Sequence, residues 1–186
     1  MILSRLYCNK PDVFQEINFN PGLNVVLAQI RLSKNKDKDT HNLGKSTLGY
    51  LIDFCLLSRF SDSLFLRKQD KLFSDFIFFL EIKIKNDYFI TIRRSVNNPS
   101  KISFKISTES LQDLTTLDKQ NWDNWELPFE AAKELLDGRL SWSAIKPSSF
   151  RAIIPYIIKI QDSYRDPFKP IEIAKPKDWK PMVGLK

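Results

Sequence analysis

Residues 42–47 combine the residue types that bind phosphate. They are Asn42, Leu43, Gly44, Lys45, Ser46 and Thr47. Gly44 lets the backbone approach a ligand closely, Lys45 offers a full positive charge, and the hydroxyl of Ser46 can bind Mg²⁺. If a helix begins here, its unpaired N–H groups and the positive end of its dipole also favour an anion. The segment predicts a site for the phosphates of a nucleotide held together with Mg²⁺.

The spacing around this segment departs from the usual phosphate-loop pattern, which is Gly-x4-Gly-Lys-Ser/Thr. Asp39 stands where the first glycine belongs. Ala28 would take that place if the polar residues 29–40 were an inserted loop beside the nucleotide, and the Lys and Arg side chains of the loop would then approach the phosphates. The alternative is that Gly-Lys-Ser-Thr is a coincidental helix start, as short motifs often are.

A strand before the segment and a helix after it would position it correctly. Residues 23–28 form a short apolar run, which is typical of a central strand covered on both faces. From Ser46 to Leu57 apolar residues recur with helical spacing and predict a helix that lies against a sheet. Residues 2–8 and 14–19 alternate on either side of a turn and predict two further strands.

The middle of the chain predicts an antiparallel meander. Residues 81–85 and 88–92 alternate on either side of Asn86 and Asp87, a two-residue turn signal, and 101–106 add a third alternating strand. One face of this meander is expected to face water. The polar residues 108–127 that follow predict an irregular excursion.

Two helix signals follow the excursion. Pro128 stands where a first helical residue would, and Gly138 is placed to end a helix over 129–137. Ser148 or Ser149 can cap another short helix. Because Pro155 should prevent that helix from continuing, residues 156–160 are expected to form a strand.

Composition limits the possible classes of protein. The chain has 186 residues, a formal net charge of +7 and 42% hydrophobic residues, which excludes disorder, collagen and a coiled-coil rod. Cys8, Cys55 and His41 are too few for a disulfide framework or a His-rich metal site. So few cysteines are typical of the reducing cytoplasm, and no apolar run reaches the about 18 residues of a membrane span, so we expect a cytoplasmic protein without membrane association. The basic excess is compatible with either nucleotide or nucleic acid.

The motifs together resemble a known family. Leu-Tyr-Cys-Asn-Lys at 6–10, Pro-Gly-Leu-Asn-Val-Val-Leu at 21–27 and His-Asn-Leu-Gly-Lys-Ser-Thr-Leu at 41–48 are similar to the amino-terminal head segment of the SMC/RecN-like ABC ATPases. More narrowly, they resemble bacterial coiled-coil ATPases with an insertion in the phosphate loop, some of them linked to phage defence. The distinctive match covers residues 1–57.

This resemblance implies an α/β fold of the P-loop NTPase class. The expected architecture is an ABC-type half-head with a mixed central sheet and an antiparallel β meander. Residues 1–168 would form the amino-terminal lobe, with a poorly matched insertion at 108–145. Residues 169–186, a basic tail punctuated by proline, would lead toward a coiled coil.

The resemblance also implies ATP and Mg²⁺ as cofactors. Gln161 resembles the family's glutamine that follows a strand and contacts Mg²⁺ or the lytic water; the alternative is a surface glutamine. The family keeps its second acidic motif (Walker B) and its Leu-Ser-Gly-Gly signature in the carboxyl-terminal half of the head, and we find neither in this sequence. Hydrolysis would therefore need that half, and this chain alone is expected to be inactive. A second head, joined on ATP binding, and double-stranded DNA are the other implied partners.

Other candidate residues give weaker support to a function. Phe-Ile-Phe-Phe-Leu-Glu at 76–81 imitates the second acidic motif but lacks a second acid, and Asp53 is expected to be structural. A small P-loop phosphotransferase would need catalytic arginines. Arg93-Arg94 and Arg67-Lys68 are available for that role but are explained as solvated faces. A non-enzymatic DNA-binding or interaction module, using the basic tail, is a further alternative.

Overall fold

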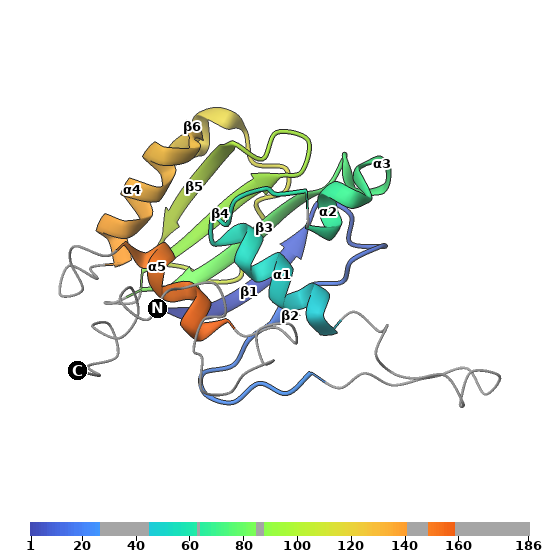
Figure 1. Cartoon of the computed structure of the whole chain (residues 1–186). Helices are drawn as coiled ribbons and strands as arrows, with labels where there is room; N and C mark the ends of the chain where they lie inside the picture. The colour runs from blue at the N-terminus through green and yellow to red at the C-terminus, as the bar shows by residue number, and fades with distance from the viewer. Residues whose placement is uncertain (27–44, 63, 85–87, 141–148, 159–186) are drawn as a thin grey trace, which may run out of the picture.

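The computed structural model describes residues 1–26, 45–62, 64–84, 88–140 and 149–158 (Figure 1). In these residues, helices pack on an open six-stranded sheet with the strand order β2-β1-β3-β4-β5-β6. The strands are β1 (Ile2–Cys8), β2 (Ile17–Asn18), β3 (Ile77–Lys83), β4 (Phe89–Ser95), β5 (Lys101–Ser107) and β6 (Asn124–Pro128). The helices are α1 (Lys45–Cys55), α2 (Phe65–Lys68), α3 (Asp70–Phe73), the 3-10 turn η4 (Lys119–Asn121), α4 (Phe129–Leu140) and α5 (Phe150–Ile157). The expected combination of helices and a sheet is confirmed.

The sheet differs from the expected mixed sheet in its strand directions. All five pairings between the described strands are antiparallel. The predicted strands at 2–8, 81–85, 88–92 and 101–106 are all present as β1, β3, β4 and β5, with shifted ends. The strand expected at 14–19 shrinks to β2, an edge strand that pairs with β1 only at Arg5 and Leu6.

The central strand expected at 23–28 is wrong for the residues that the structure describes. Residues 23–26 form no strand, and the side chains of Leu23 and Val25 are 88% and 68% exposed. A local turn competes with strand pairing here. The side chain of Asn24 accepts a hydrogen bond from the Asn20 N–H (2.8 Å) and donates one to the Asn20 carbonyl (2.9 Å), so it holds residues 20–24 in a turn.

One face of the sheet carries the main core. The inward side chains of the meander, such as Leu80, Ile92 and Phe104, are fully buried. In Figure 1 the helices α1, α4 and α5 lie on this side of the sheet. Helix α1 contacts β3 and β4, whereas α4 contacts β5 and β6. The sheet and these helices therefore form two layers around a single apolar core.

The other face of the meander is not wet, contrary to the sequence-based expectation. Phe79 is 1% exposed and stacks on Tyr7 with ring centroids 4.8 Å apart. Leu114 and Trp122, from the segment 108–127, pack over these rings as a second small core. The excursion is irregular as far as η4, as expected, and ends in β6, which pairs with β5.

The predicted helix over 129–137 is confirmed as α4, but its end is wrong by a few residues. Pro128 is the last residue of β6 and directly precedes the helix. The helix continues through Gly138 to Leu140. The buried Leu136 and Leu140 extend its apolar stripe past the glycine, and this burial exceeds the about 1 kcal/mol that a helical glycine costs.

The strand expected at 156–160 is wrong for the described residues, because α5 continues through Pro155 to Ile157. Ser149 is the N-cap residue, as expected, although its side chain makes no capping hydrogen bond. Proline removes one backbone donor from the helix. Phe150 is fully buried and Ile154 is 1% exposed, so packing against the core outweighs that loss. No helix among the described residues is long and apolar enough to cross a membrane.

Candidate functional site

The amino-terminal turn of α1 contains three of the predicted phosphate-binding residues, Lys45, Ser46 and Thr47. Leu51 and Phe54 attach the helix to the sheet, since they are 2% and 0% exposed. Ser46 is exposed and the first turn carries no acidic side chain. The first turn of a helix has N–H groups without partners inside the helix, and it lies at the positive end of the helix dipole. In α1 no carboxylate of this turn competes with a ligand for those groups. It can therefore bind an anion.

The other predicted site residues lie outside the described residues. These are Asn42, Leu43, Gly44 and Gln161, together with the loop 29–40 and the tail 169–186. The structure thus describes the helix of the predicted phosphate site but not the loop before it.

The carboxyl-terminal end of α1 is closed by a Schellman motif. The Ser58 N–H donates to the Asp53 carbonyl (3.0 Å), and the Leu57 N–H donates to the Phe54 carbonyl (3.1 Å). Leu57 has a φ of +62°, the left-handed conformation that glycine usually supplies at this position. Its side chain is only 1% exposed, so its burial offsets the backbone strain and the helix end is fixed in the core.

Arg94 of β4 holds the same end of the helix. Its guanidinium donates through Nη1 to the carbonyls of Phe54 and Ser58 and through Nε to the carbonyl of Pro99 (2.8 Å). It also lies over the Phe54 ring, 4.2 Å from the centroid. The residue is 1% exposed, and this burial lowers the pKa of the guanidinium to about 10. A cation here complements the negative end of the α1 dipole.

Arg151 of α5 supplies a second guanidinium to this end of α1. Its Nη1 donates to the Asp53 carboxylate (2.7 Å) and to the Leu56 carbonyl (3.0 Å). Asp53 is thus engaged in a structural ion pair, in agreement with the role expected from the sequence. Two arginines from distant parts of the chain therefore anchor α1 at the end opposite to Ser46.

The interpretation of Arg93-Arg94 as a solvated face is wrong. Arg94 shares its sheet face with the buried Ile90 and Ile92, and this period-two pattern was the sequence signal that could have revealed it. Arg93 points to the opposite face, where its guanidinium lies 4.6 Å from the centroid of the Trp125 ring. Partial burial lowers the pKa of Arg93.

The arginines that a phosphotransferase would need are already engaged. Arg94 is enclosed by backbone carbonyls, Arg93 stacks on Trp125, and Arg67 forms an ion pair with Asp62 (2.8 Å). A catalytic arginine must be free to reach a transferred phosphoryl group. Arg93 and Arg94 are therefore not free for that role, whereas the ion pair of Arg67 lies on the surface.

The segment 76–81, which lacks the second acid of the Walker B motif, has a structural role. Glu81 is 1% exposed and accepts hydrogen bonds from the Ser4 hydroxyl and from the Leu111 N–H (2.9 Å). Its side chain lies on the sheet face opposite to α1, since its neighbours Leu80 and Ile82 belong to the main core. Glu81 therefore holds the segment after β5 against the sheet.

The described part of the chain contains no group of three or more His, Cys, Asp or Glu side chains that could hold a metal ion. Cys8 and Cys55 are free and buried. Burial raises the pKa of both thiols, that of Cys55 to about 12. A thiol that stays protonated is a poor nucleophile, so neither cysteine has the electrostatic setting of a reactive one.

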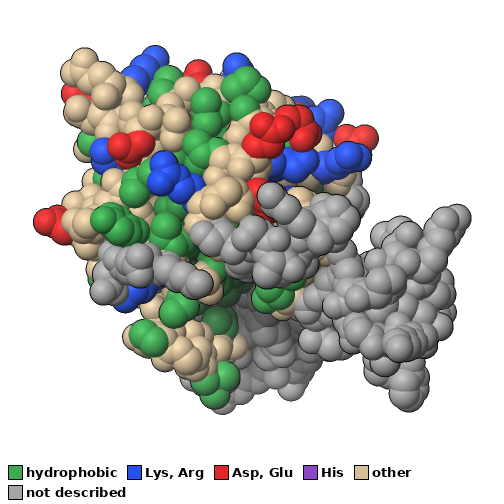
Figure 2. Space-filling model, turned by 90° about the vertical axis from the view of Figure 1, so that its left-hand side faces the viewer, with side chains coloured by type: hydrophobic (Ala, Val, Ile, Leu, Met, Phe, Trp, Pro, Cys, Tyr) green, Lys and Arg blue, Asp and Glu red, His purple; other side chains and the backbone are tan. Residues whose placement is uncertain are grey.

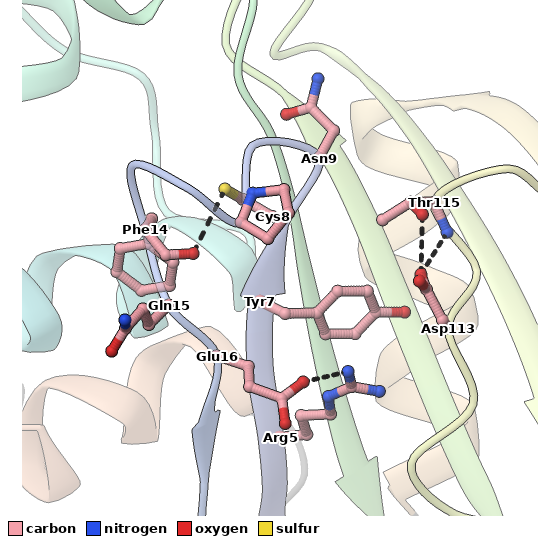
Figure 3. Close-up of a pocket in the computed structure, with 10 residues that line it drawn as sticks. Arg5, Tyr7, Cys8, Asn9, Phe14, Gln15, Glu16, Asp113 and Thr115 are labelled. Atoms are coloured by element: carbon pink, nitrogen blue, oxygen red, sulfur yellow. Dashed lines mark hydrogen bonds and ion pairs between the residues drawn. The ribbon is translucent and has the colours of Figure 1, made fainter.

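A pocket of about 420 Å³ lies beside β1, between residues 9–16 and residues 113–115 (Figure 3). Sequence reasoning did not find it. Arg5 pairs with Glu16, although its buried Nε has no hydrogen-bond partner among the described residues, and Asp113 accepts hydrogen bonds from the N–H and hydroxyl of Thr115. These partners lower the pKa of Glu16 and of Asp113, so both carboxylates are ionised and paired near neutral pH.

One face of the molecule shows no sign of a DNA-binding module built from the described residues. On the face drawn in Figure 2, Lys and Arg side chains are interspersed with Asp and Glu side chains. Nucleic-acid binding by phosphate contacts favours a continuous basic patch.

Comparisons of the chain with protein-family models, with curated proteins and with solved structures find no match.

Proposed function

We propose that this chain is the ATP·Mg-binding lobe of an SMC-like ABC ATPase. The observation that carries the proposal is α1 itself. It is an apolar helix that begins at Lys45-Ser46-Thr47, has no acidic side chain in its first turn, and is anchored to the core at its other end by Arg94 and Arg151. A helix held in this way presents its amino terminus as a fixed anion site.

Each residue of the proposed site has a defined part in binding. The N–H groups of residues 42–47 would surround the β and γ phosphates, and the Lys45 ammonium would neutralise their charge. The exposed hydroxyl of Ser46 would bind Mg²⁺. Gln161 stays a proposed second contact to the ion or to water, although α5 and not the family's strand lies before it. Mg²⁺ would supply charge neutralisation to the phosphates.

Hydrolysis would require a carboxyl-terminal half-head that brings the second acidic motif and the signature. The apolar residues 23–26 support such a partner. Leu23, Val25 and Val26 are 88%, 68% and 53% exposed, and they follow the edge strand β2. Exposed apolar side chains beside an open sheet edge are typical of an interaction surface. Pairing with a second head and contact with double-stranded DNA would follow in the assembled protein.

The biological process is proposed from the resemblance alone. The bacterial coiled-coil ATPases that this sequence resembles serve DNA-related machinery, some of it in defence against phage. We therefore place this chain in a cytoplasmic assembly of that kind.

Calorimetry with Mg·ATP tests the site. Lys45→Ala should weaken binding by about tenfold or more, since it removes a charged contact to phosphate. Lys68→Ala, a change of an exposed lysine on α2, is the matched control and should bind as the wild type does. Equal affinities of the Lys45→Ala variant and the wild type would contradict the proposal. Robust steady ATP hydrolysis by this chain alone would contradict its half-head part.

A further inference from the structure

The pocket beside β1 contains an arginine whose hydrogen bonds are incomplete. The Arg5 side chain is 11% exposed, and its Nε is buried without a hydrogen-bond partner among the described residues. Buried polar groups in folded proteins nearly always have a partner, so an exception needs an explanation. The volume of the pocket, about 420 Å³, lies within the size range of small-molecule sites. A ligand that carries an acceptor for Nε would explain both features.

The rest of the Arg5 guanidinium is fixed. Its Nη1 donates hydrogen bonds to the carbonyls of Leu111 (2.9 Å) and Gln112 (3.3 Å). Its Cζ lies 4.3 Å from the centroid of the Tyr7 ring, which stacks in turn on Phe79. The remaining edge of the guanidinium carries Nε and Nη2, a parallel pair of donors that can bind both oxygens of one carboxylate. This edge is therefore held in place before any ligand arrives, which favours binding.

Glu16 fills only half of this edge. One oxygen of its carboxylate accepts a hydrogen bond from Nη2 of Arg5, and the other accepts one from the side chain of Asn18 (3.1 Å). Figure 3 shows this single contact between Glu16 and Arg5 as a dashed line. The side chain of Glu16 is 47% exposed, compared with 11% for Arg5. Glu16 is thus the partner that can turn into solvent and leave Nη2 and Nε to another carboxylate.

The other side chains of the region limit which ligand can replace Glu16. Two further acidic residues lie nearby, namely Glu81, the register partner of Arg5 on β3, and Asp113 at the wall of the pocket. Exchange of Glu16 for one ligand carboxylate leaves the total charge unchanged, whereas a phosphate dianion would add repulsion. Pro11 and Phe14 also line the pocket and offer apolar surface to the rest of a ligand.

We propose that this pocket binds a small organic monocarboxylate with an apolar body. Its carboxylate displaces Glu16 and accepts hydrogen bonds from both Nε and Nη2 of Arg5, while the apolar body lies against Pro11 and Phe14. The displaced Glu16 side chain turns into solvent, and the buried Nε gains an acceptor.

This pocket is separate from the proposed nucleotide site. Arg5 and Tyr7 alternate along β1 with Leu6 and Cys8, which belong to the main core. The pocket therefore lies on the sheet face opposite to α1, and the inference does not rest on the proposed function. Saturating Mg·ATP should leave binding of a carboxylate unchanged, whether or not the nucleotide itself binds.

A titration of the full chain with sodium phenylacetate, followed by nuclear magnetic resonance, tests the proposal. The Nε–H signal of Arg5 should shift in a saturable way, together with the amide signals of residues 14–16 and 113–115. Phenylacetamide has nearly the same shape without the charge, and it should bind at least about tenfold more weakly. Inorganic phosphate should not displace phenylacetate at comparable concentrations.

Variants separate the two parts of the proposed exchange. Glu16→Gln should bind phenylacetate about threefold to tenfold more tightly than the wild type, because it removes the competing carboxylate. Glu130→Gln removes the same charge from an exposed position on α4, and this matched control should bind as the wild type does. Arg5→Lys should bind about tenfold more weakly, since an ammonium group cannot offer two parallel donors.

Several results would overturn the proposal. They are the lack of a saturable shift of the Arg5 signal in both the wild type and Glu16→Gln, equal binding of phenylacetamide, and an unchanged affinity in Glu16→Gln. Displacement of phenylacetate by an equal concentration of phosphate would overturn the assignment to a monocarboxylate, and displacement by Mg·ATP would overturn the separation of the two sites. Should Arg5→Lys fail to fold, Glu16→Gln still decides, because Glu16 is half exposed.

Discussion

Arg94 shows how a buried cation can be satisfied without a carboxylate hydrogen bond. Its hydrogen bonds end on the backbone carbonyls of Phe54, Ser58 and Pro99, which come from two separate segments. A buried carbonyl without a donor destabilises the folded state, and so does a buried charge without acceptors. One side chain therefore satisfies the end of α1 and the turn after β4 at the same time.

Replacement of Arg94 should be strongly destabilising. We expect Arg94→Met to lower the free energy of unfolding by about 3 kcal/mol, because it removes the buried donor to the Ser58 and Pro99 carbonyls and leaves the Phe54 carbonyl with the Leu57 N–H alone. Urea denaturation measures the change. Arg93→Met is a matched control on the next residue, which stacks on Trp125 on the other face, and it should lower the free energy of unfolding by less than about 1 kcal/mol. Equal losses in the two variants would contradict this role of Arg94.

Among the elements, the segment between β5 and β6 has an unexpected role as a cover for the sheet. Arg5 donates hydrogen bonds to the carbonyls of Leu111 and Gln112, and the Leu111 N–H donates to Glu81. Leu111 has a φ of +60°, so the chain turns sharply at this point. Beyond the turn, Leu114 and Trp122 reach the rings of the second small core. Hydrogen bonds thus fix the start of this segment, and apolar contacts pack the rest of it against the sheet.

Removal of the main apolar contact should loosen this cover. We expect Trp122→Ala to lower the free energy of unfolding by about 3–5 kcal/mol, since the Trp122 side chain is 6% exposed and packs near Phe79. Urea denaturation, followed by near-ultraviolet circular dichroism, measures the loss. Trp125→Ala, at a half-buried position, should lower it by clearly less. A Trp122→Ala variant as stable as the wild type would mean that the segment is not part of the core.

Elements with a clear local period were predictable from the sequence. The meander alternates with period two and α1 follows helical spacing, whereas α4 was predicted from its Pro128 and Gly138 signals. The predictions that were wrong concern elements that depend on contacts between residues far apart in the chain. The second core needs Tyr7 and Trp122, which are far apart in the chain, and α5 passes through Pro155 because Phe150 and Ile154 find a buried site. For the candidate site, the start of α1 at Lys45 could be predicted, whereas its anchoring by Arg94 and Arg151 could not.

At the scale of the whole molecule, the described sheet has unequal edges. Helix α4 follows directly from the edge strand β6 and contacts it. At the other edge, β2 pairs with β1 at two residues, and the exposed Leu23, Val25 and Val26 follow it. An edge with exposed apolar side chains favours association with another chain. The two edges therefore differ in how readily each could pair with another chain.

A charge placed at this edge should reduce self-association of the chain. We expect Val25→Lys to lower the concentration-dependent rise in sedimentation coefficient, with little change in the free energy of unfolding, because the side chain is 68% exposed. Leu72→Lys on α3 is the matched control, since Leu72 is also 68% exposed but lies on another part of the surface. The same effect from both substitutions, or none from Val25→Lys, would contradict a specific role for the edge.

The place of β1 between β2 and β3 has a consequence for how the chain folds as it is synthesised. Strands β3 to β6 pair with their neighbours in sequence, so the meander can form soon after it leaves the ribosome. Strand β1 is made before the other described strands, yet its long ladder is with β3, which begins only at Ile77. At roughly 5–20 residues per second, the nascent chain carries an incompletely paired β1 for several seconds. Strand β1 therefore stays incompletely paired until β3 has been made, and during that interval it is a target for chaperones.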